Sequence, residues 1–239
     1  MGKKIAIVQS NYIPWKGYFD LIRAVDEFIL YDDAQYTVRG WRNRNRIKTA
    51  KGAVWLTIPV QARGKQFQAI KGARVSREGW AREHWTTIHH AYSKAPFFKA
   101  YRDVFEPLYL GALSLWLSDI NRSLIEAICG VLNIHTVIRC SMDYRVDRRE
   151  SSTDKLISLC QQAGATEYLS GPSAKAYLDE ALFRGAGIGL SYFDYSGYPE
   201  YGQLFPPFIH EVSVVDLIFN EGHEAPRYMK SAPATAGKE

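Results

Sequence analysis

Two short apolar runs separated by a helical pattern constrain the fold of this chain more than any other feature of its sequence. Residues 5–8 form a continuous run of Ile, Ala and Val, and residues 28–31 form a second run. Such runs are typical of strands buried on both faces of a parallel sheet. Apolar residues recur at helical spacing between positions 19 and 25. Strand, helix and strand within about 27 residues predict a βαβ unit with parallel strands and a right-handed crossover.

A β-hairpin and a helical block are predicted downstream of this unit. Residues 41–48 alternate as a strand does, and residues 54–60 form a second strand that closes a hairpin with it. Residues 80–132 read as mostly helical, with Pro96 and Pro107 cutting the block into pieces. Further strands are predicted at 137–138 and 187–193, and residues 168–172 have the character of a strand followed by a turn. Further helices are predicted at 153–163 and 174–183.

These elements predict an α/β protein with a mostly parallel, Rossmann-like sheet, a β-hairpin and a helical insertion at about 78–132. Ser213 and Asp216 have the spacing of a capping box that opens a last helix. Residues 1–228 are expected to form one domain. Residues 229–239 are small and polar, which predicts a disordered tail.

Composition and charge limit the cellular compartment and the kinds of partner that we expect for this chain. No signal-peptide pattern and no run of roughly 20 apolar residues is present, so we expect a soluble, cytoplasmic protein without membrane insertion. Cys129, Cys140 and Cys160 are scattered, which predicts buried thiols rather than a metal site or disulfides. The formal net charge of +5 favours a small, phosphate-bearing substrate and is modest for a nucleic-acid partner.

Two polar loops follow the first two predicted strands and carry most of the candidate site residues. Loop 9–17 follows the first strand, and Asp32-Asp33 follows the second. Because parallel strands end at the same edge of a sheet, both loops should lie where open α/β sheets place their ligands. The first loop also runs into a helix N-terminus, which can bind an anion. Its candidate substrate-binding residues are Gln9, Asn11, Pro14, Gly17 and Tyr18.

Asp32 and Asp33 are the candidate catalytic residues. Paired carboxylates at the end of a buried strand could hold a metal, act as a general base, or bind hydroxyl groups or an amine. The alternative is structural, with one carboxylate capping the turn and the other pairing with a nearby arginine. The absence of a Walker or G-x-G-x-x-G pattern excludes a standard phosphate loop.

A basic strand provides the second group of candidates. Arg42, Arg44 and Arg46 share one face of the predicted strand with Lys48, while Asn43 and Asn45 lie on the other face. The arginines could clamp phosphates through paired hydrogen bonds. They could instead form a solvated edge that deters aggregation. The interleaved asparagines favour a polar site. Three further residues, Gln35, Ser170 and Gly171, complete the predicted substrate-binding set.

Three N-terminal motifs in this order resemble the signature of the WbqC-like family: Gln9–Phe19 (QSNYIPWKGYF), Tyr31–Tyr36 (YDDAQY) and Arg39–Ile47 (RGWRNRNRI). Later pieces agree with it: Tyr92–Phe98 (YSKAPFF), Tyr168–Gly171 (YLSG) and Ser213–Leu217 (SVVDL). The resemblance covers residues 4–224. One departure is Ser10, where the family commonly has proline. The resemblance implies a bacterial protein of O-antigen or other surface-polysaccharide biosynthesis, with glycine or aminoacyl transfer suggested for some members.

The first strand, its loop and the following helix also resemble in layout the start of nucleotidylyltransferase-type folds. Those enzymes use the two histidines of an H-x-G-H motif on nucleotide phosphates. Trp15 and Tyr18 stand at the corresponding positions here. The departure argues against ordinary adenylyl transfer, whereas a nucleotide site remains compatible with the layout.

These observations predict a transferase that acts on a nucleotide-linked or amino sugar, with aminoacyl transfer to a sugar amine as its reaction. Phosphates would be held by the arginines, and the amine by Asp32 or Asp33. The alternative function is a nucleotide- or RNA-binding module that uses the basic strand 42–48. A third hypothesis is a non-catalytic partner in a biosynthetic complex. The sequence identifies no cofactor and leaves the donor, the acceptor and the oligomeric state open.

Overall fold

A βαβ unit opens the fold, as the two apolar runs predict. The computed structural model describes residues 2–111, 114–145, 147, 149 and 151–231. Strand β1 (Lys4–Val8) leads through helix α1 (Lys16–Arg23) to strand β2 (Glu27–Leu30). The two strands pair in parallel along their whole length. Their side chains alternate between two apolar clusters, so the sheet is buried on both faces.

Three further parallel strands complete a sheet with a Rossmann-like layout. They are β5 (Val137–Cys140), β6 (Glu167–Ser170) and β7 (Gly189–Tyr192), and the strand order is β5-β2-β1-β6-β7. All four pairings are parallel. From β1 the chain first builds outward through β2 and β5, and then continues on the other side through β6 and β7. The strand order therefore reverses between β1 and β6, which is where such sheets bind ligands.

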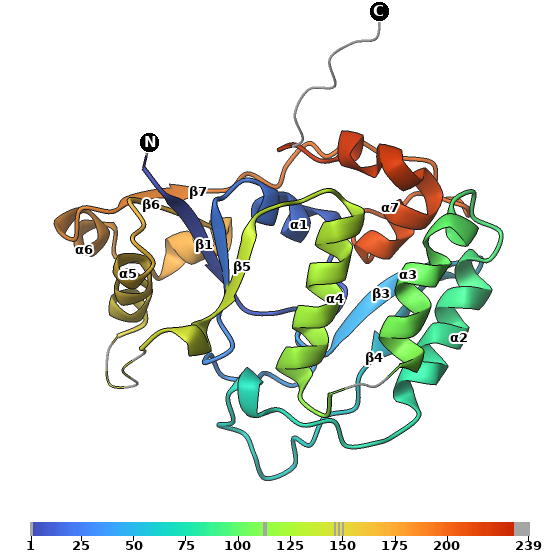
Figure 1. The fold of residues 1–239 in the computed structure, drawn as a ribbon, viewed down its shortest axis with the longest axis horizontal. Helices are drawn as coiled ribbons and strands as arrows, with labels where there is room; N and C mark the ends of the chain where they lie inside the picture. Colours follow the sequence, from blue (N-terminus) through green and yellow to red (C-terminus); the bar gives the residue numbers. More distant parts are fainter. Residues whose placement is uncertain (1, 112–113, 146, 148, 150, 232–239) are drawn as a thin grey trace, which may run out of the picture.

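An antiparallel hairpin and a group of helices lie beside the sheet (Figure 1). The hairpin consists of β3 (Arg44–Thr49) and β4 (Gly52–Thr57), joined by a tight turn in which Gly52 has a φ of +101°. Helices α2 (Trp80–Tyr92), α3 (Phe98–Leu110) and α4 (Leu117–Val131) form the predicted helical block. Helices α2 and α3 lie on the far side of the hairpin from α5 and α6 (Figure 1).

Two apolar clusters fill the two sides of the sheet. The larger joins one face of the sheet to α1, the hairpin, the helical block and α7 (Val214–Glu221). The smaller packs the other face against α5 (Ser152–Gln162) and α6 (Glu180–Gly185). Four short 3-10 helices complete the fold: η1 (Ile70–Gly72), η2 (Ser141–Asp143), η3 (Pro172–Ala176) and η4 (Gly222–Tyr228).

Two predicted helix boundaries are wrong. Pro107 does not cut the helical block, because α3 continues through it, and the carbonyl of Pro107 still accepts a hydrogen bond from Gly111. Only the missing N–H of the proline is lost to the helix. The helix predicted at 174–183 is divided into η3 and α6. Asp179 starts α6 as a new helix, because its carboxylate accepts the backbone N–H groups of Ala181 and Leu182.

The predicted capping box at the start of α7 is also wrong. Ser213 Oγ accepts the N–H of Val215, but the carboxylate of Asp216 does not return a bond to Ser213. The fully buried Asp216 carboxylate instead accepts hydrogen bonds from the hydroxyl groups of Tyr92 and Tyr201, each at 2.8 Å. The backbone N–H of Ser213 donates to the carbonyl of Arg46, which ties α7 to the hairpin.

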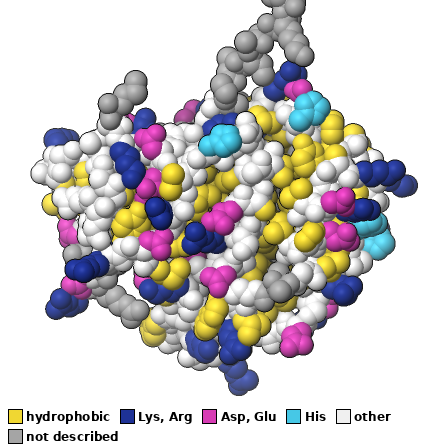
Figure 2. Space-filling model, in the orientation of Figure 1, with side chains coloured by type: hydrophobic (Ala, Val, Ile, Leu, Met, Phe, Trp, Pro, Cys, Tyr) yellow, Lys and Arg dark blue, Asp and Glu magenta, His cyan; other side chains and the backbone are white. Residues whose placement is uncertain are grey.

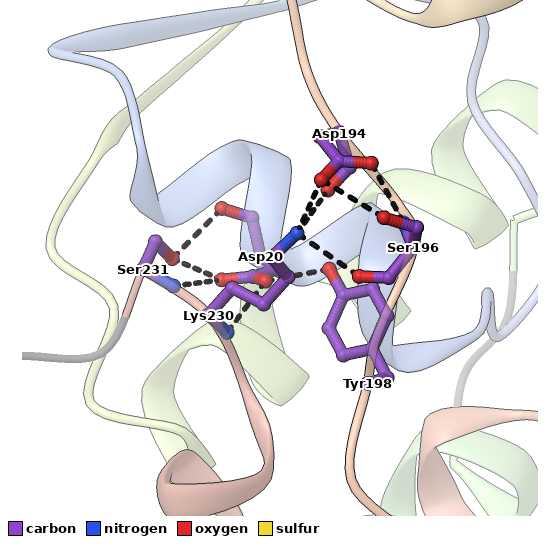
Figure 3. A network of polar contacts seen from close by, with 6 residues as sticks. All are labelled: Asp20, Asp194, Ser196, Tyr198, Lys230 and Ser231. Atoms are coloured by element: carbon purple, nitrogen blue, oxygen red, sulfur yellow. Dashed lines mark hydrogen bonds and ion pairs between the residues drawn. The ribbon is translucent and has the colours of Figure 1, made fainter.

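The chain after η4 is held against α1 by a buried carboxylate (Figure 3). Asp20 accepts the hydroxyl of Tyr198 at 2.5 Å and the backbone N–H groups of Lys230 and Ser231, both at 2.8 Å. The ammonium of Lys230 also pairs with Asp194 at 2.9 Å. Residues 229–231 of the predicted tail are therefore packed, and 232–239 lie outside the described residues.

Candidate functional site

A cavity of about 870 Å³ opens at the carboxyl ends of β1, β2 and β6, next to the point where the strand order reverses. This is the edge that the βαβ prediction indicates for a ligand. Its volume falls in the range that suits small-molecule sites. Eight predicted site residues line it: Gln9, Asn11, Tyr18, Asp33, Gln35, Arg42, Ser170 and Gly171. Seven do not: Pro14, Gly17, Asp32, Asn43, Arg44, Asn45 and Arg46.

Asp32 and Asp33 are adjacent in sequence but have different environments. Asp32 is fully buried outside the cavity wall. Its carboxylate accepts the backbone N–H of Ser10 at 2.9 Å, the hydroxyl of Ser10 at 2.8 Å and the hydroxyl of Ser118 at 2.5 Å. These bonds connect the loop after β1 to the loop after β2 and to α4. Asp32 has the role of a buried structural carboxylate.

Asp33 lines the cavity and has two fixed partners. Lys71 Nζ lies 2.5 Å from its Oδ1, and the hydroxyl of Ser141 donates to its Oδ2 at 2.8 Å. Ser141 follows β5 directly, so three neighbouring segments of the fold hold this carboxylate in place. An oriented carboxylate of this kind can accept hydrogen bonds from hydroxyl groups or from an amine.

Arg42 brings a positive charge to the same cavity. Its guanidinium donates to the side-chain oxygen of Asn11, and burial lowers the pKa of Arg42 from its ordinary value. The Asp32 carboxylate opposes this shift by Coulombic attraction. No carboxylate forms an ion pair with Arg42 in the part of the chain that the structure describes. A half-buried guanidinium without a counter-ion is suited to bind an anionic group of a ligand.

The loop after β1 is fixed by bonds to the hairpin and to the helical block. Asn45 donates to the carbonyls of Tyr12 and Ile13, while the N–H of Tyr12 donates to the carbonyl of Trp41. The hydroxyl of Tyr12 is bonded to His84 Nδ1 at 2.8 Å. Burial lowers the pKa of His84 to about 4. The two asparagines that were predicted to bind substrate therefore have structural roles. Asn45 holds the loop after β1, and Asn43 donates a hydrogen bond to the carbonyl of Ile58.

The N-terminus of α1 does not face the cavity as an open anion site. Trp15 precedes the helix, and a Cβ on Gly17 would lie 2.3 Å from its ring. The indole therefore packs directly on the first turn, and Trp15 forms the cavity wall there in place of Gly17. Gly17 is needed for this close approach. Pro14 lies in the same loop, and its carbonyl accepts the N–H of Val214.

Arg44 and Arg46 point to a different surface from Arg42. Both stack on the ring of Trp55, with the Arg44 guanidinium carbon 4.2 Å and that of Arg46 5.6 Å from the ring centre. Arg46 also lies 3.9 Å from Glu211. The alternation predicted for the strand places these two arginines on its outer face, whereas Arg42 lies in the turn before β3. The predicted three-arginine clamp therefore does not converge on the cavity.

Several lining residues were not among the candidates from the sequence. They are mainly aromatic or hydroxyl-bearing: Trp15, Tyr31, Ser152, Tyr168, Ser173, Tyr177 and Tyr195, together with Lys155. Trp15 and Tyr31 lie in or next to the two predicted loops, and Tyr168 lies in β6. The others come from α5, from the turn after β6 and from the segment after β7, which lie far along the chain from the two predicted loops. The tyrosines at 192–201 were noted as possible ring-stacking residues, but no spacing separates Tyr195 from the tyrosines that only pack.

No cluster of three or more potential ligands for a metal ion exists among the described residues. No helix in the described ranges has the length and apolar character required to cross a membrane. The three cysteines are free and buried. Burial raises the pKa values of Cys129 and Cys160 to about 12, so neither thiol is an activated nucleophile.

Comparison with known families and proteins agrees with the motifs of the two loops. The family model described as the WbqC-like protein family matches residues 9–228. The chain belongs to this family. Both polar loops, the hairpin and all the cavity-lining segments lie at or within the matched region, apart from the last residues of β1.

One relative covers almost the same length. The chain is 50% identical over 228 residues to "Uncharacterized protein Rv1507c" of Mycobacterium tuberculosis (strain ATCC 25618 / H37Rv). The match covers 95% of this chain and 98% of that protein. No solved structure matches.

Proposed function

We propose that the chain is a transferase of surface-polysaccharide biosynthesis that acts on an amino sugar, often a nucleotide-linked one. In this reaction an aminoacyl group, such as glycyl, is transferred to the sugar amine. Membership of the WbqC-like family supports the placement in polysaccharide biosynthesis. The cavity supports the substrate class.

The observation that carries the proposal is the presence of both charges in one cavity. Arg42 offers a cation that forms no ion pair with a carboxylate of the described residues, and Asp33 offers an oriented carboxylate. A phosphate-bearing amino sugar presents the complementary pair of charges, since its phosphate is anionic and its amine is protonated or can donate. Aromatic side chains of Trp15, Tyr177 and Tyr195 provide apolar surface for rings. The volume of about 870 Å³ accommodates a nucleotide sugar.

Each residue has a defined role in the proposed reaction. Arg42 and Asn11 bind the phosphate, and Asp33 holds the acceptor amine. The amine nitrogen attacks the acyl carbonyl carbon, a C–N bond forms, and the bond from that carbon to the leaving group breaks. Asp33 accepts the proton that the amine loses. Lys71 and Ser141 keep the carboxylate in position. Asp32 acts only through the loops that it connects.

The experiment that tests the proposal is calorimetric titration with a uridine diphosphate amino sugar. We expect Arg42→Gln to weaken binding at least tenfold, because a charge-assisted bond to phosphate is lost. Arg102→Gln serves as the matched control, since Arg102 is exposed on α3 and paired with Asp103. Equal affinity of wild type and Arg42→Gln for every nucleotide sugar that binds would contradict the proposed phosphate site.

A further inference from the structure

The basic residues of this chain are concentrated in one segment without any acidic residue. Residues 34–77, here called the acid-free segment, contain eleven Lys and Arg and no Asp or Glu. The other 195 residues contain 19 basic and 25 acidic residues, so they carry a formal charge of −6. The modest net charge of +5 therefore conceals a strongly basic stretch. The expectation against a nucleic-acid partner relied on that net charge.

The fold leaves much of this charge uncompensated at the surface. The acid-free segment forms the β3–β4 hairpin and the loop from β4 to α2. Only Arg46, Lys71 and Arg77 have a carboxylate within 4.0 Å, as far as the described residues extend. The exposed cations of the segment without such a carboxylate are Arg39, Lys51, Arg63, Lys65 and Arg74. Figure 2 shows Lys and Arg side chains gathered at the lower edge, where the loop from β4 to α2 runs in Figure 1.

Two exposed aromatic rings belong to the same segment. Trp41 and Trp55 are 44% and 45% exposed, and their ring centres are 5.4 Å apart with an interplanar angle of 36°. Arg44 and Arg46 stack on Trp55, and the Nε atoms of both are buried without a hydrogen-bond partner. We call these four residues the tryptophan platform. Guanidinium planes stacked on exposed indoles are arranged to bind phosphates and unpaired bases together.

We propose that the acid-free segment binds single-stranded RNA, with bases on the tryptophan platform and phosphates on the surrounding cations. A single strand fits better than a duplex, because protruding rings can stack only on bases that are not already stacked and paired. The positive charge supplies affinity, and the stacked rings supply the preference for unpaired bases.

The platform is connected to the cavity through the chain itself. Arg42 lines the cavity from the turn before β3, and Arg44 of the platform follows it as the first residue of β3. The proposed RNA strand continues from the platform past this turn, so that its 3′ end enters the cavity. If the proposed transfer is correct, on which this step rests, the donor is an aminoacyl ester of an RNA 3′ end. The C–N bond to the sugar amine forms, the ester C–O bond breaks, and the released 3′ oxygen takes up a proton.

The test is fluorescence anisotropy with a 5′-labelled, single-stranded 12-nucleotide RNA that ends in CCA. With four phosphates contacted, the affinity should fall roughly 50-fold between about 50 and 200 mM salt. Trp55→Ala should weaken binding at about 50 mM salt by about fivefold or more. Leu182→Ala is the control, because Leu182 is 44% exposed but lies on α6, outside the acid-free segment. The double variant Arg44→Gln/Arg46→Gln should reduce the salt slope by about 1.4.

Three results would overturn this inference. They are binding that does not depend on salt, equal losses from Trp55→Ala and Leu182→Ala, and equal affinity for the single strand and for a 12-base-pair duplex of the same sequence. All these measurements use binding alone. A protein that binds the nucleotide sugar but not the RNA would refute the inference and leave the proposed transferase intact. A protein that binds the RNA but no nucleotide sugar would refute the proposed transferase and leave the RNA-binding inference intact.

Discussion

The two adjacent aspartates should respond in opposite ways to the same substitution. Asp32→Asn replaces a fully buried carboxylate that accepts three hydrogen bonds, from the backbone and hydroxyl of Ser10 and from the hydroxyl of Ser118. Bonds to a charged acceptor are about twice as strong as neutral ones, and the new amide group places a donor where three donors already point. We expect a loss of about 2–4 kcal/mol in the free energy of unfolding.

Asp33→Asn should leave stability nearly unchanged. The Asp33 side chain is 13% exposed and Lys71 is 32% exposed, so the ion pair between them is partly screened by solvent. We expect the free energy of unfolding to fall by about 1 kcal/mol or less. Activity should be lost, because an amide cannot accept the proton of the acceptor amine and presents a donor to it on one side.

The assay is urea unfolding of both variants and wild type, followed by binding and turnover measurements on the folded proteins. In a chain of 239 residues, a loss of 2–4 kcal/mol corresponds to a fall of roughly 4 to 16 °C in Tm. The reasoning is refuted if Asp32→Asn is as stable as wild type, or if Asp33→Asn is the variant that unfolds. A stable Asp33→Asn protein with full turnover would remove Asp33 from the reaction.

Three further predictions follow from buried contacts. Because the pKa of His84 is about 4 in the fold and about 6.5 when unfolded, the unfolded state binds more protons between these values. The contribution of neutral His84 to the free energy of unfolding should therefore be complete above about pH 6.5, and the free energy should fall by up to about 3 kcal/mol as the pH drops toward 4. In urea unfolding, His84→Gln should lose less stability over the same pH range than wild type. Gly17→Ala should lower the free energy of unfolding by about 1–3 kcal/mol, since the added Cβ would lie 2.3 Å from the Trp15 ring. The same variant should bind the nucleotide sugar more weakly in calorimetry, and unchanged affinity would argue against Trp15 as a ligand contact. Asp20→Asn should release the segment that contains Lys230 and expose it to trypsin, and wild-type resistance in this variant would contradict the role assigned to the Asp20 network.

The sequence predicts the sheet edge of the site well because the signal there is local. The two apolar runs predict the pairing of β1 with β2, and parallel pairing places the loops that follow them on one edge. Gln9, Asn11, Asp33 and Gln35 line the cavity for this reason alone. The resemblance to the WbqC-like family rests on the same stretch and agrees with the matched family model.

The remaining features could not be predicted because they depend on tertiary contacts. The sequence cannot show which of two adjacent aspartates turns inward, since that depends on Ser10 and on Ser118, which lies 86 residues from Asp32. The alternation of Arg42, Arg44 and Arg46 predicts a common face, but β3 begins only at Arg44, so Arg42 leaves the pattern. The aromatic wall at Tyr177 and Tyr195 comes from segments whose spacing resembles that of any packed tyrosine.

The most direct test of the central claim is a crystal structure with a bound uridine diphosphate amino sugar. The account predicts density in the cavity between the ends of β1 and β6, with the diphosphate against Arg42 and the sugar amine within hydrogen-bond distance of Asp33. Density elsewhere on the molecule, or in the cavity with the phosphates facing away from Arg42, would contradict it.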